Sequence, residues 1–216
     1  MRFSYNGRFW SGMGKVWDMI LLSFYWLVLC IPVITIIPST IALYYTAAKV
    51  LRKGVSYVTP EFFRAFRQNL RQGIGVNLLY LLIVVFLFMI RGFVDWQTLE
   101  NNWGKVYYVF YLVFIMVGAG VTYYMLPVLS RFQVSILGAF RLSLYFGSRN
   151  LLTMVPLLIT FAGAIALVYT LPITILVVPA FYAWLMTKPV EKTLRNYILK
   201  ELPNPEEHEG MWYMEL

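Results

Sequence analysis

Few residues in this chain have side chains that could perform acid–base, nucleophilic or metal chemistry. The only histidine, His208, lies in the polar segment ELPNPEEHEG, and the only cysteine, Cys30, lies inside an apolar run. The ten acidic residues fall at the ends of apolar runs, in the connections between them, or in that same polar segment. Catalysis, metal binding and proton coupling within a membrane need acids, histidines or a nucleophile beside a base inside the runs. We therefore expect no catalytic residues, no metal and no cofactor, and an enzyme is the least favoured class of function.

The polar side chains inside the apolar runs are hydroxyls and amides, and many of the hydroxyls belong to tyrosine. Aromatic rings stack on sugars and hydroxyl groups bond to them, so five tyrosines are candidates for lining a substrate path: Tyr44, Tyr45, Tyr80, Tyr123 and Tyr124. Tyrosine also marks membrane interfaces, and Ser, Thr and Asn hold membrane helices together. A packing role is therefore the main alternative for these residues.

The composition is that of an integral membrane protein. Of the 216 residues, 60% are hydrophobic and 13% are charged, whereas a soluble domain carries about 25% charged residues. The mean hydropathy is +0.68, and several apolar runs approach the roughly 20 residues needed to cross a bilayer. We expect an all-α, polytopic membrane helix bundle whose first apolar run is retained as a membrane helix rather than cleaved as a signal.

Prolines and the distribution of charge predict six spans with both termini in the cytoplasm. Pro32 and Pro38 bracket a turn in the first long apolar block, and Pro172 marks a turn in the last. With six spans, 16 of the 18 Lys and Arg residues are cytoplasmic and only Arg91 and Lys105 are outside. The positive-inside rule favours this arrangement. We expect one membrane domain over residues 1–202, with spans at about 17–32, 38–52, 74–94, 106–126, 150–170 and 173–187, and a cytoplasmic tail over 203–216.

Two cytoplasmic segments, at about 60–73 and 137–148, are predicted to form amphipathic helices. At about 100° per residue, Phe62 and Phe66 of the first segment share an apolar arc, whereas Arg64, Arg67 and Arg71 share a polar one. A helix of this kind lies along the inner leaflet or binds a cytosolic partner. Both interpretations stay open, and the five residues are candidates for partner contact.

The pattern A-F-R-x-x-L-x-x-G occurs in both segments, at 65–73 and at 139–147, which suggests a parallel internal repeat. Chance similarity in an apolar sequence of low diversity is the alternative. In the second copy, Leu142, Tyr145 and Phe146 replace the polar residues of the first. A helix that is apolar all round must be covered. We therefore expect residues 137–148 to be covered by this chain or by a partner, with four candidate contacts: Phe140, Arg141, Tyr145 and Phe146.

The segments WLVLCIPVITIIPSTIALYY at 26–45 and EFFRAFRQNLRQG at 61–73 resemble the YesL family of bacterial membrane proteins. The family commonly has a glycine before the second proline of the turn, where this chain has Ile37. The family is largely defined by a domain of unknown function, and its members are mostly from Gram-positive bacteria. They are typically encoded beside ABC importers of complex oligosaccharides. The resemblance thus implies a link to glycan uptake, and it brings no catalytic residues.

The leading hypothesis is a non-enzymatic accessory subunit in the cell membrane, bound beside the permease subunits of a carbohydrate ABC importer and possibly its ATPase. One alternative is a stand-alone transporter or channel that passes a neutral solute. Another is a membrane sensor or assembly factor whose cytosolic helices and tail recruit other proteins. The excess of positive charge fits anionic lipid at the cytoplasmic surface, and no nucleic-acid partner is expected.

Overall fold

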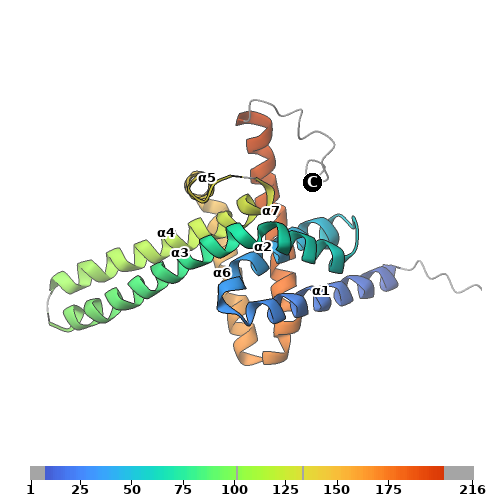
Figure 1. Cartoon of the computed structure of the whole chain (residues 1–216). Helices are drawn as coiled ribbons and strands as arrows, with labels where there is room; N and C mark the ends of the chain where they lie inside the picture. The colour runs from blue at the N-terminus through green and yellow to red at the C-terminus, as the bar shows by residue number, and fades with distance from the viewer. Residues whose placement is uncertain (1–7, 101, 133, 202–216) are drawn as a thin grey trace, which may run out of the picture.

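The computed structural model describes residues 8–100, 102–132 and 134–201, and all regular structure in these ranges is helical. Figure 1 shows the helices and their labels. The first half of the chain contains α1 (Arg8–Cys30), the short 3-10 helix η1 (Val33–Thr35), α2 (Ile36–Thr46), the π-helical turn η2 (Ala47–Arg52) and α3 (Val58–Glu100). The second half contains α4 (Asn102–Arg131), α5 (Ile136–Arg149), α6 (Leu151–Thr170), the 3-10 helix η3 (Pro172–Leu176) and α7 (Val178–Glu201).

Several helices are long and apolar enough to cross a membrane. Four segments of the described chain meet this criterion, namely Met13–Cys30, Val33–Arg52, Val58–Gly92 and Trp103–Arg131, and Val155–Thr170 is a shorter apolar stretch. These lengths and compositions are those of a membrane helix bundle. Six spans and the orientation of the termini stay predictions.

The turn between the first two apolar helices lies where the prolines predicted it. The Thr35 hydroxyl donates to the carbonyl of Leu29 at 2.5 Å and to that of Pro32 at 2.8 Å. Asn77 of α3 closes the turn from the other side, since its amide donates to the carbonyl of Val33 at 2.9 Å and accepts from the N–H of Ile37 at 3.3 Å. The backbone groups freed by the chain reversal are thereby satisfied.

The predicted amphipathic helix at 60–73 is not a separate element. It forms the first part of α3, which continues without a break to Glu100. Gly73 lies at the place where the sequence changes from amphipathic to apolar. A Cβ atom at Gly73 would lie 2.9 Å from the Cβ of Pro38. The glycine therefore allows α2 and α3 to pack closely rather than ending the helix, and the predicted boundary was wrong.

The distal halves of α3 and α4 form a two-helix arm that projects from the rest of the molecule (Figure 1). We call the described side chains of Leu78–Gly92 and Trp103–Ile115 the apolar arm. Large apolar residues are exposed along both of its helices, for example Phe88 at 77% and Phe110 at 69%. Among the described residues no third helix covers the arm, and α6 and α7 run in another direction (Figure 1).

The C-terminal part contains the second predicted amphipathic helix and a hairpin. Helix α5 matches the predicted range 137–148 within a residue or two at each end, and the Ser135 hydroxyl caps it by accepting from the N–H of Gly138 at 3.2 Å. Helix α6 ends at Thr170 and η3 begins at Pro172, where the turn was predicted. Helix α7 continues to Glu201, well past the predicted end of the last span at 187.

The core has two adjacent parts. One joins α2, α3, α4, α5 and α7 around Tyr44, Val76, Tyr124, Phe146 and Val190, all nearly inaccessible to solvent. The other joins α1, η2, α3 and α7, with Leu22, Ala47, Phe62, Ala65 and Ala180 buried in it. Both parts lie toward the end of α3 that precedes the apolar arm. This is the region that brings the polar side chains together.

Candidate functional site

Charged and hydroxyl side chains from five helical elements meet between the two parts of the core. We call this group the charged cluster, and it consists of Tyr44, Tyr45, Lys49, Arg52, Glu61, Arg64, Arg131, Thr187 and Glu191. These residues come from α2 and η2, the start of α3, the end of α4 and the middle of α7. The basic residues were expected in connections at the membrane surface, yet several of them turn inward to reach partners on other helices.

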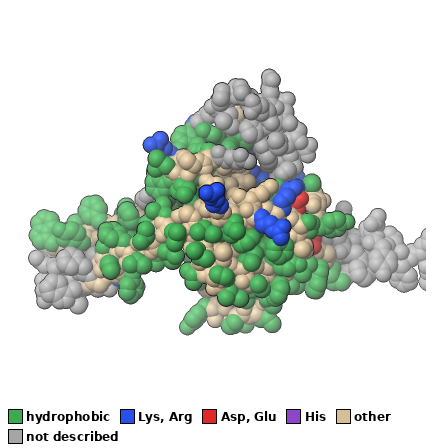
Figure 2. All heavy atoms as spheres, in the orientation of Figure 1, with side chains coloured by type: hydrophobic (Ala, Val, Ile, Leu, Met, Phe, Trp, Pro, Cys, Tyr) green, Lys and Arg blue, Asp and Glu red, His purple; other side chains and the backbone are tan. Residues whose placement is uncertain are grey.

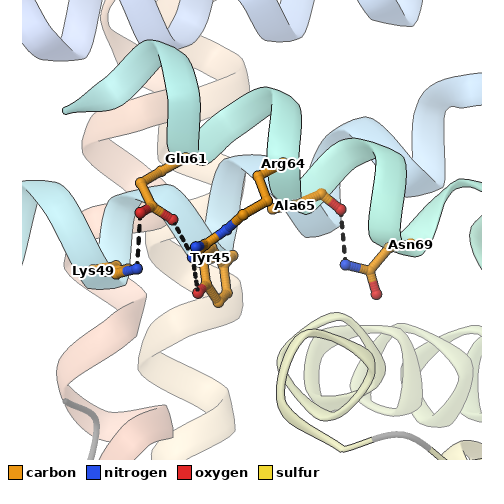
Figure 3. Close-up of polar contacts among 6 residues, drawn as sticks. All are labelled: Tyr45, Lys49, Glu61, Arg64, Ala65 and Asn69. Carbon is orange, nitrogen blue, oxygen red and sulfur yellow. Dashed lines mark hydrogen bonds and ion pairs between the residues drawn. The ribbon is translucent and has the colours of Figure 1, made fainter. Parts of the chain in front are cut away.

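The first half of the charged cluster is centred on Glu61, in the first turn of α3 (Figure 3). Its carboxylate accepts from Lys49 Nζ at 2.8 Å and from Arg64 at 2.5 Å. Arg64 also donates to the hydroxyl of Tyr45 at 3.0 Å. A carboxylate at a helix N-terminus is favoured by the helix dipole. The helical spacing puts Glu61 on the same arc as Arg64, but Glu61 is buried because its two cations neutralise it.

Asn69, a polar residue that the helical spacing puts on the same arc as Phe62 and Phe66, does not join the cluster. Its side-chain amide donates to the carbonyl of Ala65, one turn earlier in α3, at 2.9 Å (Figure 3). Because this hydrogen bond to its own helix satisfies the amide, Asn69 can lie on a half-buried face.

The second half of the charged cluster is centred on Glu191 of α7. Its Oε1 accepts from Arg131 at 2.5 Å and from the Tyr44 hydroxyl at 2.8 Å. The side chains of Arg131 and Glu191 are each only 3% exposed. Tyr45 connects the two halves, because its ring lies under the Arg131 guanidinium at 5.4 Å and within 5.8 Å of Lys49 Nζ. Both distances are in the range of cation–π contacts.

Arg52 extends the cluster along α7. Its Nε donates to the hydroxyl of Thr187 at 2.5 Å, and its guanidinium donates to the carbonyl of Trp184 at 2.7 Å and lies 5.1 Å from the Trp184 ring. In the sequence, Arg52 and Arg131 each follow a tyrosine pair at the same spacing. Both bind α7, at positions 184, 187 and 191, which share one face of a helix. The two arginines that follow matching tyrosine pairs thus make similar contacts with α7. The internal repeat itself stays a prediction.

The charged cluster is suited to holding helices together. Each buried carboxylate is engaged by at least two donors, and removing one partner of a buried ion pair costs about 3–5 kcal/mol. Among the described residues, no three His, Cys, Asp or Glu side chains are grouped so that they could hold a metal ion. The two buried acids are therefore committed to structural contacts.

A cavity of about 490 Å³ adjoins the charged cluster. It lies between α2, α4, α6 and α7, with Trp26 of α1 at its edge, and it is partly open to the surroundings. Its wall is mostly apolar. Five hydroxyl side chains contribute to the wall, and they are Thr40, Tyr44, Thr122, Tyr123 and Tyr182. Tyr44 belongs to both sites, because its side chain lines the cavity while its hydroxyl donates to Glu191.

The five tyrosines predicted to line one substrate path separate into three environments. Tyr44 and Tyr123 line the cavity, and Tyr45 lies in the charged cluster. Tyr80 donates to the sulfur of Met125 at 3.6 Å, and Tyr124 packs against Phe146 with ring centroids 6.0 Å apart. The structure therefore brings only two of the five into one cavity, and the others serve helix packing.

The residues predicted to contact a partner fall into a buried group and an exposed group. Phe62 and Phe146 are fully buried against the chain's own helices, so they form no part of an exposed surface, and Phe66 is half-buried. Arg64 is half-exposed and belongs to the charged cluster. The exposed members are Arg67, Arg71, Phe140 and Arg141. Figure 2 shows Lys and Arg side chains over the middle and upper parts of the molecule, whereas the lower part is hydrophobic on the face in view.

The expectation that residues 137–148 are covered by protein holds for one face of α5 only, because this chain covers Phe146 and half-buries Tyr145 while Leu137, Phe140 and Leu144 are exposed. Tyr145 and Phe146 of α5 pack against Tyr197 of α7, with ring centroids 5.9 and 5.1 Å apart. Tyr145 also accepts a hydrogen bond from Arg149. These contacts attach α5 to the C-terminal half of α7.

Sequence reasoning missed the roles of Glu61, Glu191 and Arg131. All three were assigned to surface connections because they flank apolar runs. A weak signal existed for Glu191, which stands alone among four basic residues at 188–200. A single acid among cations beside a membrane span is a candidate for an internal ion pair, although the sequence does not identify its partner.

The comparison with known families assigns no activity to the chain. A family model described as "Protein of unknown function, DUF624" matches residues 19–89. This range includes Tyr45, Lys49, Glu61 and Arg64, but it ends before Arg131 and Glu191. No curated protein and no solved structure has a significant match to the chain.

Proposed function

We propose that this chain is a YesL-type, non-enzymatic accessory subunit of a carbohydrate ABC importer. In this proposal it lies in the cell membrane of a Gram-positive bacterium, with both termini in the cytoplasm, beside the permease subunits. The resemblance of residues 26–45 and 61–73 to the YesL family supports the link to oligosaccharide import. The apolar arm supports assembly with other membrane proteins, and this observation carries the structural part of the proposal.

The apolar arm is suited to contact membrane helices of another protein. It consists of two antiparallel helices with large apolar side chains exposed along both of them. Among the described side chains of the arm, the charged ones are Arg91 and Lys105, near its far end. Surface of this kind is covered either by lipid or by protein. Projection beyond the core allows the arm to reach a neighbouring permease while the charged cluster holds the rest of the chain together.

Site-specific photo-crosslinking in native membranes tests this assignment. A photoreactive amino acid is placed at Phe88 or Phe110 of the arm, and at Ile159 of α6 as a control with similar exposure, 66%. We expect the arm positions to form adducts with permease subunits and the α6 position to label mainly lipid. Adducts with lipid alone at both arm positions, together with no co-purification of permease or ATPase subunits, would contradict the proposal.

A stand-alone transporter for a neutral solute is the second candidate, and the cavity favours it. Two of the predicted path residues, Tyr44 and Tyr123, line the same partly open space. Proteoliposomes that contain only this chain should then take up a labelled neutral solute, whereas an accessory subunit should leave them impermeable.

A sensor or assembly factor is the third candidate, in which the segment 203–216 recruits other proteins. This segment lies outside the described residues. Its deletion should abolish recruitment under this hypothesis, but it should leave any intrinsic transport unchanged.

A further inference from the structure

The hydroxyl groups around the cavity differ in one respect, namely whether they already have a hydrogen-bond partner. Tyr44 donates to Glu191 at 2.8 Å, and Tyr182 donates to the carbonyl of Leu157 at 3.2 Å. Thr40 and Thr122 donate to the carbonyls of the residues one turn earlier, Ile36 and Gly118, at 2.7 and 2.8 Å. Four of the five hydroxyls are thus satisfied within the protein.

The hydroxyl of Tyr123 is the exception. Tyr123 is 7% exposed, its oxygen is buried, and no described residue forms a hydrogen bond with it. Its ring is held at right angles to that of Tyr124, with centroids 5.4 Å apart. A buried hydroxyl without a partner is destabilising and therefore calls for an explanation. Tyr123 lines the cavity while its oxygen is inaccessible, so a shift of the side chain is needed to bring the hydroxyl to a ligand in the cavity, and such a ligand is the partner we infer.

The rest of the wall limits what that ligand can be. Leu126, Leu158, Phe161 and Met186 are typical of the lining, and the charged cluster lies behind Tyr44 rather than within the space. A sugar would bury several hydroxyls against a mostly apolar wall that offers one free hydroxyl donor, which is unfavourable. The cavity instead suits a long apolar molecule with a single hydrogen-bonding group near one end. Its volume lies within the range of about 300–1,000 Å³ that ligand pockets have.

We propose that the cavity binds one acyl chain of a membrane glycerolipid, whose ester carbonyl accepts a hydrogen bond from the Tyr123 hydroxyl. The bilayer is the source, because the apolar outer surfaces of α4 and α6 place lipid directly beside the partly open cavity. The acyl chain fills the apolar space, and the carbonyl supplies the acceptor that the protein lacks. This inference requires only a membrane location, so it stands or falls independently of any link to sugar import.

Photolabelling by a lipid probe tests the proposal. The full chain is reconstituted in phosphatidylglycerol vesicles that contain a trace of phosphatidylglycerol with a diazirine on one acyl chain, and labelled residues are identified by mass spectrometry. Ala164→Phe of α6 adds bulk to the cavity wall, whereas Ala166→Phe adds the same bulk on the exposed side of α6. We expect labelling at Leu126, Leu158 and Met186 in the original chain and in Ala166→Phe, but not in Ala164→Phe.

The single substitution Tyr123→Phe isolates the hydrogen bond and changes the fold least. Loss of one such bond should weaken lipid retention about fivefold. Retention is measured as the amount of unlabelled lipid that must be added to displace the probe. Thermal unfolding in detergent confirms that each variant is folded. Equal labelling of the cavity residues in Ala164→Phe and Ala166→Phe would overturn the proposal, as would displacement of the probe by a soluble oligosaccharide. Labelling confined to the apolar arm and the exposed side of α6 would also overturn it.

Discussion

At the scale of single residues, Glu191 and Arg131 carry the largest energetic consequence. Both side chains are almost completely buried, and each is the other's charged partner at 2.5 Å. A buried ion pair is weak evidence for high stability, but the loss of one partner leaves an uncompensated charge in a medium of low polarity. Correct packing of α4 against α7 therefore requires both residues of the pair.

We predict that Glu191→Leu lowers the free energy of unfolding by about 3–5 kcal/mol, because Arg131 then stays buried without its carboxylate. The double variant Glu191→Leu with Arg131→Met should recover much of this loss, since both charges are removed. Thermal unfolding in a mild detergent measures both effects. Lys192→Ala, one position along α7 and exposed, is the control and should change stability by less than about 0.5 kcal/mol.

If Glu191→Leu lowers the free energy of unfolding no more than Lys192→Ala does, the Arg131–Glu191 contact does not stabilise the fold. Failure of the double variant to recover stability would show that the hydrogen bond from Tyr44 to Glu191, rather than the ion pair, holds α7 in place.

At the scale of elements, the sequence predicted several helices well and one boundary wrongly. The turns at Pro32–Pro38 and Pro172 could be predicted because prolines act locally, and the range of α5 could be predicted from the repeated pattern at 139–147. The separate helix at 60–73 was predicted because polarity changes at Gly73. In the structure Gly73 lies inside α3 where Pro38 of α2 approaches it closely, and a periodicity analysis of α3 alone contains no information about α2. The ion pairs were missed for the same reason, since they join residues far apart in the sequence.

The contact between α2 and α3 gives the prediction at this scale. Gly73→Ala would place a Cβ atom 2.9 Å from the Cβ of Pro38, so one helix must move and stability should fall by about 1–3 kcal/mol. Gly163→Ala of α6 meets no atom within 4 Å, and it should be neutral or slightly stabilising because alanine favours helix over glycine. Comparison of the two unfolding midpoints tests this, and equal midpoints would contradict the close approach of α2 and α3.

At the scale of the whole molecule, the distribution of positive charge and the predicted topology can be tested together. Cysteine is introduced singly at Arg67, Arg141 or Ile173 in a Cys30→Ser background, since Cys30 is the only native thiol. All three positions are exposed in the structure. A membrane-impermeant thiol reagent should label position 173 in intact cells, whereas positions 67 and 141 should react only after the membrane is permeabilised. Labelling of position 67 or 141 in intact cells would contradict the predicted orientation.

The docking of both Arg52 and Arg131 on α7 has a consequence for how the protein is made. Chains are synthesised from the N-terminus, so both arginines leave the ribosome before the helix that receives them. Until Thr187 and Glu191 follow, these two cations have no acceptor on α7 and are best hydrated at the membrane surface. Once α7 has been synthesised, the guanidinium groups can leave the water and bind it. We therefore expect the earlier helices to complete their packing late in biogenesis.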